Sequence, residues 1–314
     1  MLRSRRFSLI AVLGLIAGTA IAADPKPPVK VFILAGQSNM EGHGFIKAEA
    51  KRNEGKGSLE YVVRDPATAT QFKHLVDKDG KWIVRDDVSI HYLDRKGPLT
   101  VGYGAREDRI GPELGLGHVL GEAYEEPVLL IKLAWGGKSL AKDFRPPSSG
   151  GEVGPYYTEI ITRTHDVIRD LSKHFPQFEG RKSEIVGFGW HQGWNDRISP
   201  TFNAEYEKNL ANLIRDLRKD LGVKNLPFVV GGTEMGTDAE THPRAVSLVK
   251  AQAAVAGYEE FKGNVAFVST RKFWRTQEQS PSGQGYHWNT NAETYYLIGD
   301  AMGHALLKLT GQEK

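Results

Sequence analysis

The chain has 314 residues, with 41 Lys and Arg, 38 Asp and Glu, and no cysteine. The missing cysteine excludes disulfides, a thiolate nucleophile and cysteine-ligated metal sites. The net charge of +3 comes entirely from the first 22 residues, which hold three Arg and no acidic residue. The remainder has 38 basic and 38 acidic residues, so charge gives no reason to expect a nucleic-acid or membrane partner.

The first residues have the pattern of a secretory signal peptide. Arg3, Arg5 and Arg6 precede an apolar run at 7–16, and Ala20-Ile21-Ala22 is a small-residue cleavage site. The alternative is a transmembrane anchor, but the apolar run is short for a span of about 20 residues. The pattern predicts cleavage after Ala22 and a secreted or periplasmic protein.

Apolar strand patterns alternate with helical patterns along the rest of the chain. We expect strands at 29–35, 127–133, 184–190, 226–230 and 263–269, and helices at 112–125, 156–174, 203–221, 243–256 and 292–309. Near-continuous apolar strands that alternate with helices favour a parallel sheet covered on both faces. Residues 23–314 are therefore expected to form a single α/β domain.

One stretch, 45–108, interrupts this alternation. It is rich in charge and Gly and has only short strand-like pieces, at 82–84 and 90–92. We interpret it as an insertion after the first strand. It could be a small β excursion that borders a functional site, because long segments of this kind are often functional in a compact domain. The alternative is a surface decoration without a functional role.

The strongest motif is Gly36-Gln37-Ser38-Asn39-Met40, directly after the first predicted strand. Open α/β sheets bind ligands at the carboxyl ends of their strands. Gly36 permits a sharp turn, which would project Ser38 over those ends as a nucleophile once a base takes its proton. The alternative is that Ser38 only caps a helix.

Three further loops can complete such a site. His287, in a Gly-rich loop before the last helix, is a candidate base, although a single histidine is more often structural. Gly136 and Gly137 follow the second predicted strand and could present backbone N–H groups to an oxyanion, or could be an ordinary turn. Gln192 and Asn195 follow the third predicted strand and offer side-chain amides, although residues 195–196 could also cap a turn.

Together these loops resemble the SGNH (GDSL-like) hydrolases, in particular the branch of carbohydrate esterase family 6 and sialate O-acetylesterase-like proteins. The matching blocks are 36–40, 136–137, 190–196 and His287, and the resemblance spans 29–310 with 45–108 outside it. It implies a three-layer α/β/α fold with a central parallel sheet of the flavodoxin-like kind.

The resemblance also implies roles for these residues. Ser38 would attack an acetyl ester, and His287 would act as general base and then as general acid. The oxyanion hole would consist of the Ser38 N–H, a backbone N–H of Gly136 or Gly137, and the amide of Gln192 or Asn195.

The sequence departs from the family at the acid. The family has Asp-x-x-His in its last block, whereas Gln284 stands three residues before His287. An acid normally fixes the imidazole tautomer and stabilises the imidazolium. Gln284 could orient the ring without a charge, or a carboxylate from elsewhere could replace the acid: Asp196, Glu234 or Glu278. Otherwise the centre is a Ser-His dyad, or the chain only binds glycans.

The leading expectation is an esterase that removes O-acetyl groups from carbohydrate, of the acetylxylan or sialate type, without cofactor or metal. The alternatives are a glycan-binding relative without activity and a general short-chain carboxylesterase or lipase. Possible sugar contacts are Gln37, Asn39, Trp135, Trp194 and Arg145. The tryptophans of the loops, Trp190 and Trp288 included, could instead pack in the core, and a surface salt bridge is the favoured role of Arg145.

Overall fold

The computed structural model describes residues 26–313, except for the side chains of residues 238 and 239. The predicted signal peptide, residues 1–22, lies outside the described residues. Within 26–313, no helix is long and apolar enough to cross a membrane.

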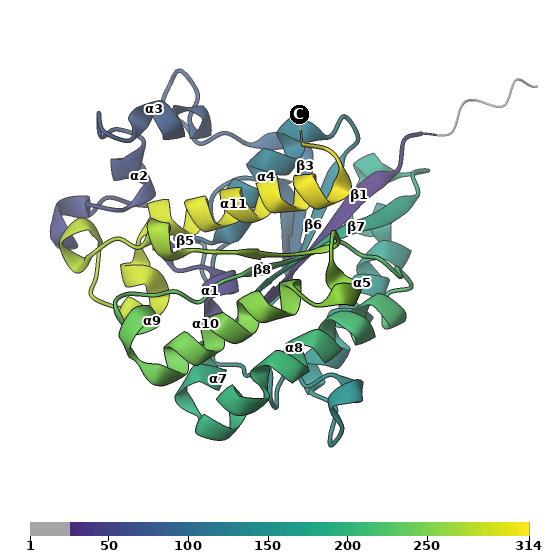
Figure 1. Ribbon diagram of the computed structural model, residues 1–314. Helices are drawn as coiled ribbons and strands as arrows, with labels where there is room; N and C mark the ends of the chain where they lie inside the picture. The colour runs from purple at the N-terminus through teal and green to yellow at the C-terminus, as the bar shows by residue number, and fades with distance from the viewer. Residues whose placement is uncertain (1–25, 314) are drawn as a thin grey trace, which may run out of the picture.

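A seven-stranded sheet forms the centre of the molecule (Figure 1). Its strands are β1 (Val29–Gly36), β3 (Arg85–Tyr92), β4 (Arg95–Leu99), β6 (Val128–Ala134), β7 (Ser183–His191), β8 (Phe228–Gly231) and β9 (Val265–Val268). Their order is β4-β3-β6-β1-β7-β8-β9, and every neighbouring pair is parallel except β3–β4. The strands β6-β1-β7-β8-β9 reproduce the flavodoxin-like order, so the predicted fold class is confirmed.

Helices cover both faces of this sheet, with α4 and α11 on one face and α5, α8 and α10 on the other (Figure 1). The helices are α1 (Ser38–Glu41), α2 (Leu59–Val62), α3 (Ala69–Phe72), α4 (Pro112–Ala123), α5 (Pro155–Arg169), α6 (Leu171–His174), α7 (Trp194–Ile198), α8 (Pro200–Asp220), α9 (Asp238–Thr241), α10 (Pro243–Ala256) and α11 (Ala292–Thr310). Short 3-10 turns occur at Asn53–Gly55, Lys73–Leu75, Pro147–Ser149, Pro176–Phe178, Glu259–Phe261, Arg271–Phe273, Gln277–Gln279 and Gly285–Thr290.

Strand β1 explains why there are two cores. Its side chains alternate between the two faces of the sheet. Val31 and Ile33 pack in the core beneath α5, α8 and α10, whereas Phe32 and Leu34 pack in the core beneath α4 and α11. All four side chains are fully buried, which accounts for the continuous apolar run in the sequence.

The stretch 45–108, interpreted from the sequence as an insertion after the first strand, contributes to the main sheet. Strand β3 pairs with β6 and β4 pairs with β3, so part of this stretch belongs to the main sheet. The piece at 82–84 is not a strand, because Trp82 makes only an isolated bridge to Val76. A second, two-stranded sheet of β2 (Gly44–Phe45) and β5 (Arg109–Ile110) joins the ends of the stretch.

A buried ion pair links the sheet to the helix that carries Ser38. The Lys132 ammonium donates to Glu113 Oε2 at 2.6 Å, to the Tyr103 carbonyl at 2.7 Å and to the Glu41 carbonyl at 2.6 Å. The Lys132 and Glu113 side chains are fully buried. Desolvation lowers the pKa of Lys132, and the Glu113 carboxylate opposes this shift. The Lys132 ammonium therefore joins α1, α4 and the loop around Tyr103 that connects β4 with β5.

Replacing Lys132 by Met should destabilise the protein by about 3–5 kcal/mol, because Glu113 would keep its buried charge without a countercharge. In the double variant Lys132→Met/Glu113→Gln the loss should be smaller than the sum of the two single losses, since the residues are coupled. Chemical denaturation measures both effects. A loss below about 1 kcal/mol for Lys132→Met would contradict this account.

Candidate active site

The loops selected from the sequence meet at the carboxyl ends of β1, β6 and β7. Ser38 begins α1 directly after β1, and His287 lies in the 3-10 turn Gly285–Thr290 before α11. The His287 Nε2 and Ser38 Oγ atoms are 2.9 Å apart, within hydrogen-bond distance, although the residues are 249 positions apart in the chain. The structure thus brings the predicted nucleophile and base together at the switch point of the sheet.

The turn at Gly36 directs Ser38 over the strand ends. Gly36 has φ +153°, and a Cβ at this position would lie 2.2 Å from the His191 carbonyl oxygen of β7. The N-cap residue of α1 is Gln37, so Ser38 is not the helix cap. Ser38 is the first residue of the helix, where a backbone N–H has no acceptor within the helix.

Several contacts fix the loop that carries His287. The Asn39 side-chain amide donates to the Tyr286 carbonyl at 3.1 Å, and the His287 N–H donates to the Gln284 carbonyl at 2.8 Å. Trp288 and Asn289 both have φ +51°. Burial lowers the pKa of His287 to about 4, so the imidazole is neutral at neutral pH and able to accept a proton.

Within the described part of the chain, no carboxylate bonds to the Nδ1 atom of His287. Its Nδ1 atom is buried and has no hydrogen-bond partner among residues 26–313. Gln284 lines the same cavity as His287, and its backbone forms hydrogen bonds with Ser282, His287 and Asn289. The prediction that Gln284 orients Nδ1 therefore finds no supporting contact in the described part of the chain.

The three candidate carboxylates lie elsewhere. Asp196 is fully buried and accepts from the N–H groups of Leu140 and Ala141, each at 2.8 Å. The Glu234 carboxylate accepts from the Thr270 N–H at 2.6 Å. Glu278 is exposed, and its pKa is lowered by the Thr276 hydroxyl. None of the three partners His287 Nδ1, since each serves its own segment.

Asp196 instead joins the two loops that follow β6 and β7. Besides its two N–H donors it accepts from Gln192 Nε2 at 2.6 Å. Burial raises the pKa of Asp196 to about 6, and the three hydrogen bonds oppose that shift. This carboxylate therefore fixes the position of the loop after β6 relative to the loop after β7.

The structure also changes the predicted oxyanion hole. Gln192 is fully buried, and its amide faces Asp196, Gln37 and the Lys138 carbonyl, so it does not face a substrate. Asn195 is partly exposed and donates to the Gly137 carbonyl, which leaves its second amide hydrogen for an oxyanion.

The two glycines of this block are both exposed at the site. The Gly136 N–H interacts with the Glu41 carboxylate. The Gly136 N–H is therefore already engaged, whereas Gly137 and Asn195 are exposed or partly exposed in the loops beside Ser38.

Gln37 and Asn39 are not sugar contacts, because both are buried. The side-chain oxygen Oε1 of Gln37 accepts from the Gln192 amide, from the Gly193 N–H at 3.1 Å and from the Asn195 N–H at 3.3 Å. Asn39 Oδ1 accepts from the Tyr295 hydroxyl at 2.8 Å. Their amides connect the Ser38 turn to the other loops.

The tryptophans of the loops divide into two groups. Trp190 and Trp288 are fully buried core residues. Trp135 is partly exposed and packs on Tyr156 with 4.8 Å between ring centroids, while Trp194 lies 5.8 Å from the exposed ring of Tyr286. Only this second group can contact a ligand.

Arg145 is engaged by its own surroundings. It donates to the carbonyls of Ala141, Ser149 and Gly150 and forms an ion pair with Glu205 at 3.0 Å. This confirms the favoured salt-bridge role.

Sequence reasoning missed a cluster beside His287. The His43 and His287 rings are stacked, with 3.8 Å between centroids and 7° between planes. Both rings line a cavity of about 720 Å³ together with Arg106, Arg109 and Tyr286. A histidine so soon after the nucleophile was the available signal, because it had to lie near the same strand ends.

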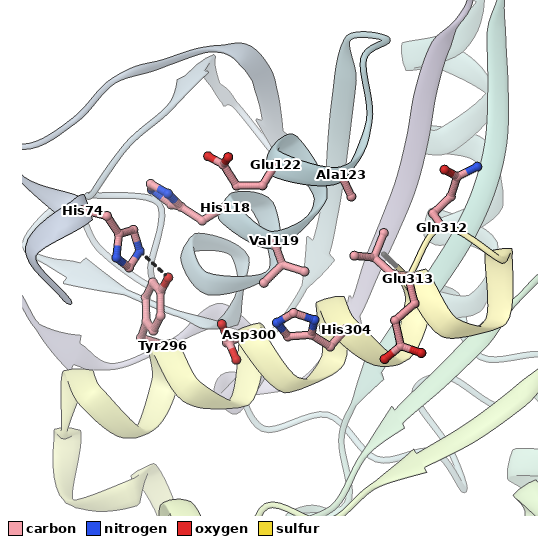
Figure 2. A pocket seen from close by; sticks show the side chains of 11 residues that line it. His74, His118, Val119, Glu122, Ala123, Tyr296, Asp300, His304, Gln312 and Glu313 are labelled. Carbon is pink, nitrogen blue, oxygen red and sulfur yellow. Dashed lines mark hydrogen bonds between the residues drawn. The ribbon is translucent and has the colours of Figure 1, made fainter. Parts of the chain in front are cut away.

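A second hollow lies away from this site, between α4, α11 and the turn Lys73–Leu75 (Figure 2). His74, His118 and His304 line it, and His74 Nε2 lies 2.8 Å from the Tyr296 hydroxyl. Across residues 26–313, no group of three His, Asp or Glu side chains is arranged to hold a metal ion. This hollow shares no lining residue with the cavity beside His287.

The fold has relatives of known structure. A protein from Arabidopsis thaliana superposes with a TM-score of 0.60 at 17% identity, covering 90% of this chain and 98% of that chain. A carbohydrate acetylesterase from Xanthomonas citri gives 0.53 at 14% identity over 90% and 56%. NanS gives 0.56 at 15% identity over 90% and 98%.

Sequence comparisons agree with these structures. The chain is 25% identical over 215 residues to a probable carbohydrate esterase from Arabidopsis thaliana, which covers 65% of this chain and 69% of the relative. The family model for carbohydrate esterases described as sialic acid-specific acetylesterases matches residues 28–308. The chain therefore belongs to this carbohydrate esterase family.

Proposed function

We propose that the protein is a serine esterase that removes O-acetyl groups from carbohydrate through a Ser38–His287 dyad. The observation that carries this proposal is the 2.9 Å contact between Ser38 Oγ and the half-buried, neutral His287 ring. A serine becomes a nucleophile when a neutral base within hydrogen-bond distance takes its proton.

In the first half of the reaction, Ser38 Oγ attacks the acetyl carbonyl and its proton passes to His287 Nε2. The tetrahedral intermediate collapses as the sugar oxygen leaves with that proton, and Ser38 carries the acetyl group. In the second half, a water molecule gives a proton to His287 and attacks the acyl carbon, which releases acetate and returns a proton to Ser38.

The negative charge that develops on the carbonyl oxygen needs donors in place. We assign the Ser38 N–H, the Gly137 N–H and the Asn195 amide to this role, because the first belongs to the nucleophile itself and Gly137 and Asn195 are exposed or partly exposed in the loops beside it. One such donor typically contributes about 3–4 kcal/mol of transition-state stabilisation.

We further propose that the protein acts outside the cytoplasm, in the secreted or periplasmic space, on the basis of the pattern at residues 1–22. The partly exposed rings of Trp135, Trp194 and Tyr286 would contact the sugar. Acetylxylan and O-acetylated sialic acid are the substrates to compare first.

A glycan-binding relative without activity is the second candidate, since His287 Nδ1 has no partner among the described residues. Acetate release from acetylated xylan, acetylated sialic acid and a nitrophenyl acetate distinguishes the candidates. Glycan binding with no acetate from any substrate would favour the binding protein, and faster turnover of long acyl chains would favour a lipase.

Replacing Ser38 by Ala should lower kcat for acetate release at least about 100-fold. In enzymes with a full triad, removing the serine lowers kcat about 10⁶-fold, and losing the acid alone lowers it about 10⁴-fold. A centre that already lacks the acid therefore has about 100-fold left to lose. Steady-state hydrolysis of nitrophenyl acetate measures the loss. Ser269→Ala, at an exposed serine away from the site, is the matched control and should leave kcat unchanged. Unchanged hydrolysis in the Ser38 variant would overturn the assignment.

The pH profile of kcat/KM should rise with an apparent pKa of about 4 and stay flat to pH 8. The base must be neutral, and burial holds the pKa of His287 at about 4, so protonation below that pH removes the base. The profile of nitrophenyl acetate hydrolysis tests this, with His304→Gln as the control histidine outside the site. A limb near pH 6.5 would instead indicate an ordinary, solvated imidazole.

A further inference from the structure

His43 lies directly against the proposed base. It is five residues beyond Ser38 and precedes β2, while His287 comes from the far end of the chain. The two rings stack with 3.8 Å between centroids and 7° between planes. His43 therefore covers one face of the imidazole that must receive the Ser38 proton.

The backbone on either side fixes His43 in this place. Gly42 has φ +91°, and a Cβ at Gly42 would lie 2.0 Å from the Gly111 Cα atom. The Tyr295 hydroxyl interacts with the His43 backbone and donates to Asn39 Oδ1. The same turn that carries Ser38 thus also sets the position of the stacked ring.

Burial and the charges around His43 both favour its neutral ring. Burial is the main cause of its low pKa, about 3, and the neighbouring His287, Arg109, Arg106 and Lys132 lower it further. Ser38 and Tyr286 also contact His287, and the described residues place no carboxylate in contact with its Nδ1. Burial and these neighbouring charges therefore disfavour the protonated form of His43.

We propose that His43 is a positioning residue that takes over part of the work of the missing acid. This inference rests on the proposed esterase function. By stacking, His43 holds the plane of the His287 ring so that Nε2 stays aligned with Ser38 Oγ.

Stacking differs from an acid in a measurable way. A carboxylate at Nδ1 fixes the tautomer and raises the pKa of the imidazole. A neutral ring over the face keeps water away and leaves the pKa low, consistent with the value of about 4 for His287. Replacing His43 by a residue without a ring should therefore lower kcat and move the acid limb of the pH profile to higher pH.

The first test compares His43→Ala with His43→Phe in nitrophenyl acetate hydrolysis. His43→Ala should lower kcat by about 3- to 30-fold, because the His287 ring loses part of its alignment with Ser38 Oγ, with KM unchanged. Its acid limb should move from about pH 4 toward 6.5 because water reaches His287. His43→Phe retains a stacked ring and should keep both the rate and the limb close to the wild type.

A second test uses Gln284→Asp, which restores the family's Asp-x-x-His spacing. With an acid at 284, His43→Ala should cost less in kcat than in the wild-type background, because the two groups act on the same ring. Thermal melting of every variant separates loss of the fold from loss of positioning. Equal losses for His43→Ala and His43→Phe, or an unchanged kcat and acid limb in His43→Ala, would overturn the proposal.

An NMR titration of His287 keeps this inference separate from the proposed function. With His287→Asn used to assign the signal, the pKa of His287 should rise in His43→Ala and stay low in His43→Phe. This result does not depend on activity. If the wild type released no acetate while this titration behaved as expected, the esterase assignment would fail and the stacking effect on His287 would stand. An unchanged titration in His43→Ala would reject the stacking effect itself.

Discussion

The close approach of β1 to β7 at Gly36 is the constraint on which the site depends. Because a Cβ at Gly36 would lie 2.2 Å from the His191 carbonyl oxygen, the chain can leave β1 over its neighbour only with glycine at this position. That exit places Ser38 at the switch point, where the chain turns from building one half of the sheet to building the other. The loops after β6 and β7 then necessarily border Ser38.

Buried polar groups turn this meeting of loops into a fixed geometry. Gln37 accepts hydrogen bonds from the loop after β7, and Asp196 joins that loop to the one after β6. Lys132 binds the last carbonyl of α1 from beneath. Such groups are costly to bury without partners, so each contact made here limits the alternative arrangements of the loops. The side chains nearest Ser38 thus act mainly as its support.

Much of this could be predicted from the sequence because its signals are local. The apolar strands at 29–35, 127–133 and 184–190 correspond to β1, β6 and β7, and glycine and serine at a strand end indicate a turn and a nucleophile. Only the end of β3 was predicted, as the strand-like piece at 90–92, because its first residues, Arg85-Asp86-Asp87, are charged although the strand pairs within the main sheet. The direction of an amide was equally hidden: Gln192 and Asn195 are chemically alike, and only burial decides which one faces the site.

The stacked pair could not be predicted for a different reason, since its partners come from opposite ends of the chain. The position of His43 soon after Ser38 indicates only that it lies near the same strand ends, because its stacking depends on the position of His287 in the folded molecule. The same geometry bears on whether the chain has lost catalysis. A protein that only binds glycans has no need to hold Ser38 Oγ and an imidazole Nε2 at 2.9 Å, nor to bury that imidazole at a cost to its protonated form. The proposed Ser38–His287 dyad requires this alignment. Because the described residues place no carboxylate at His287 Nδ1, the dyad needs a base that is oriented by packing instead of by charge.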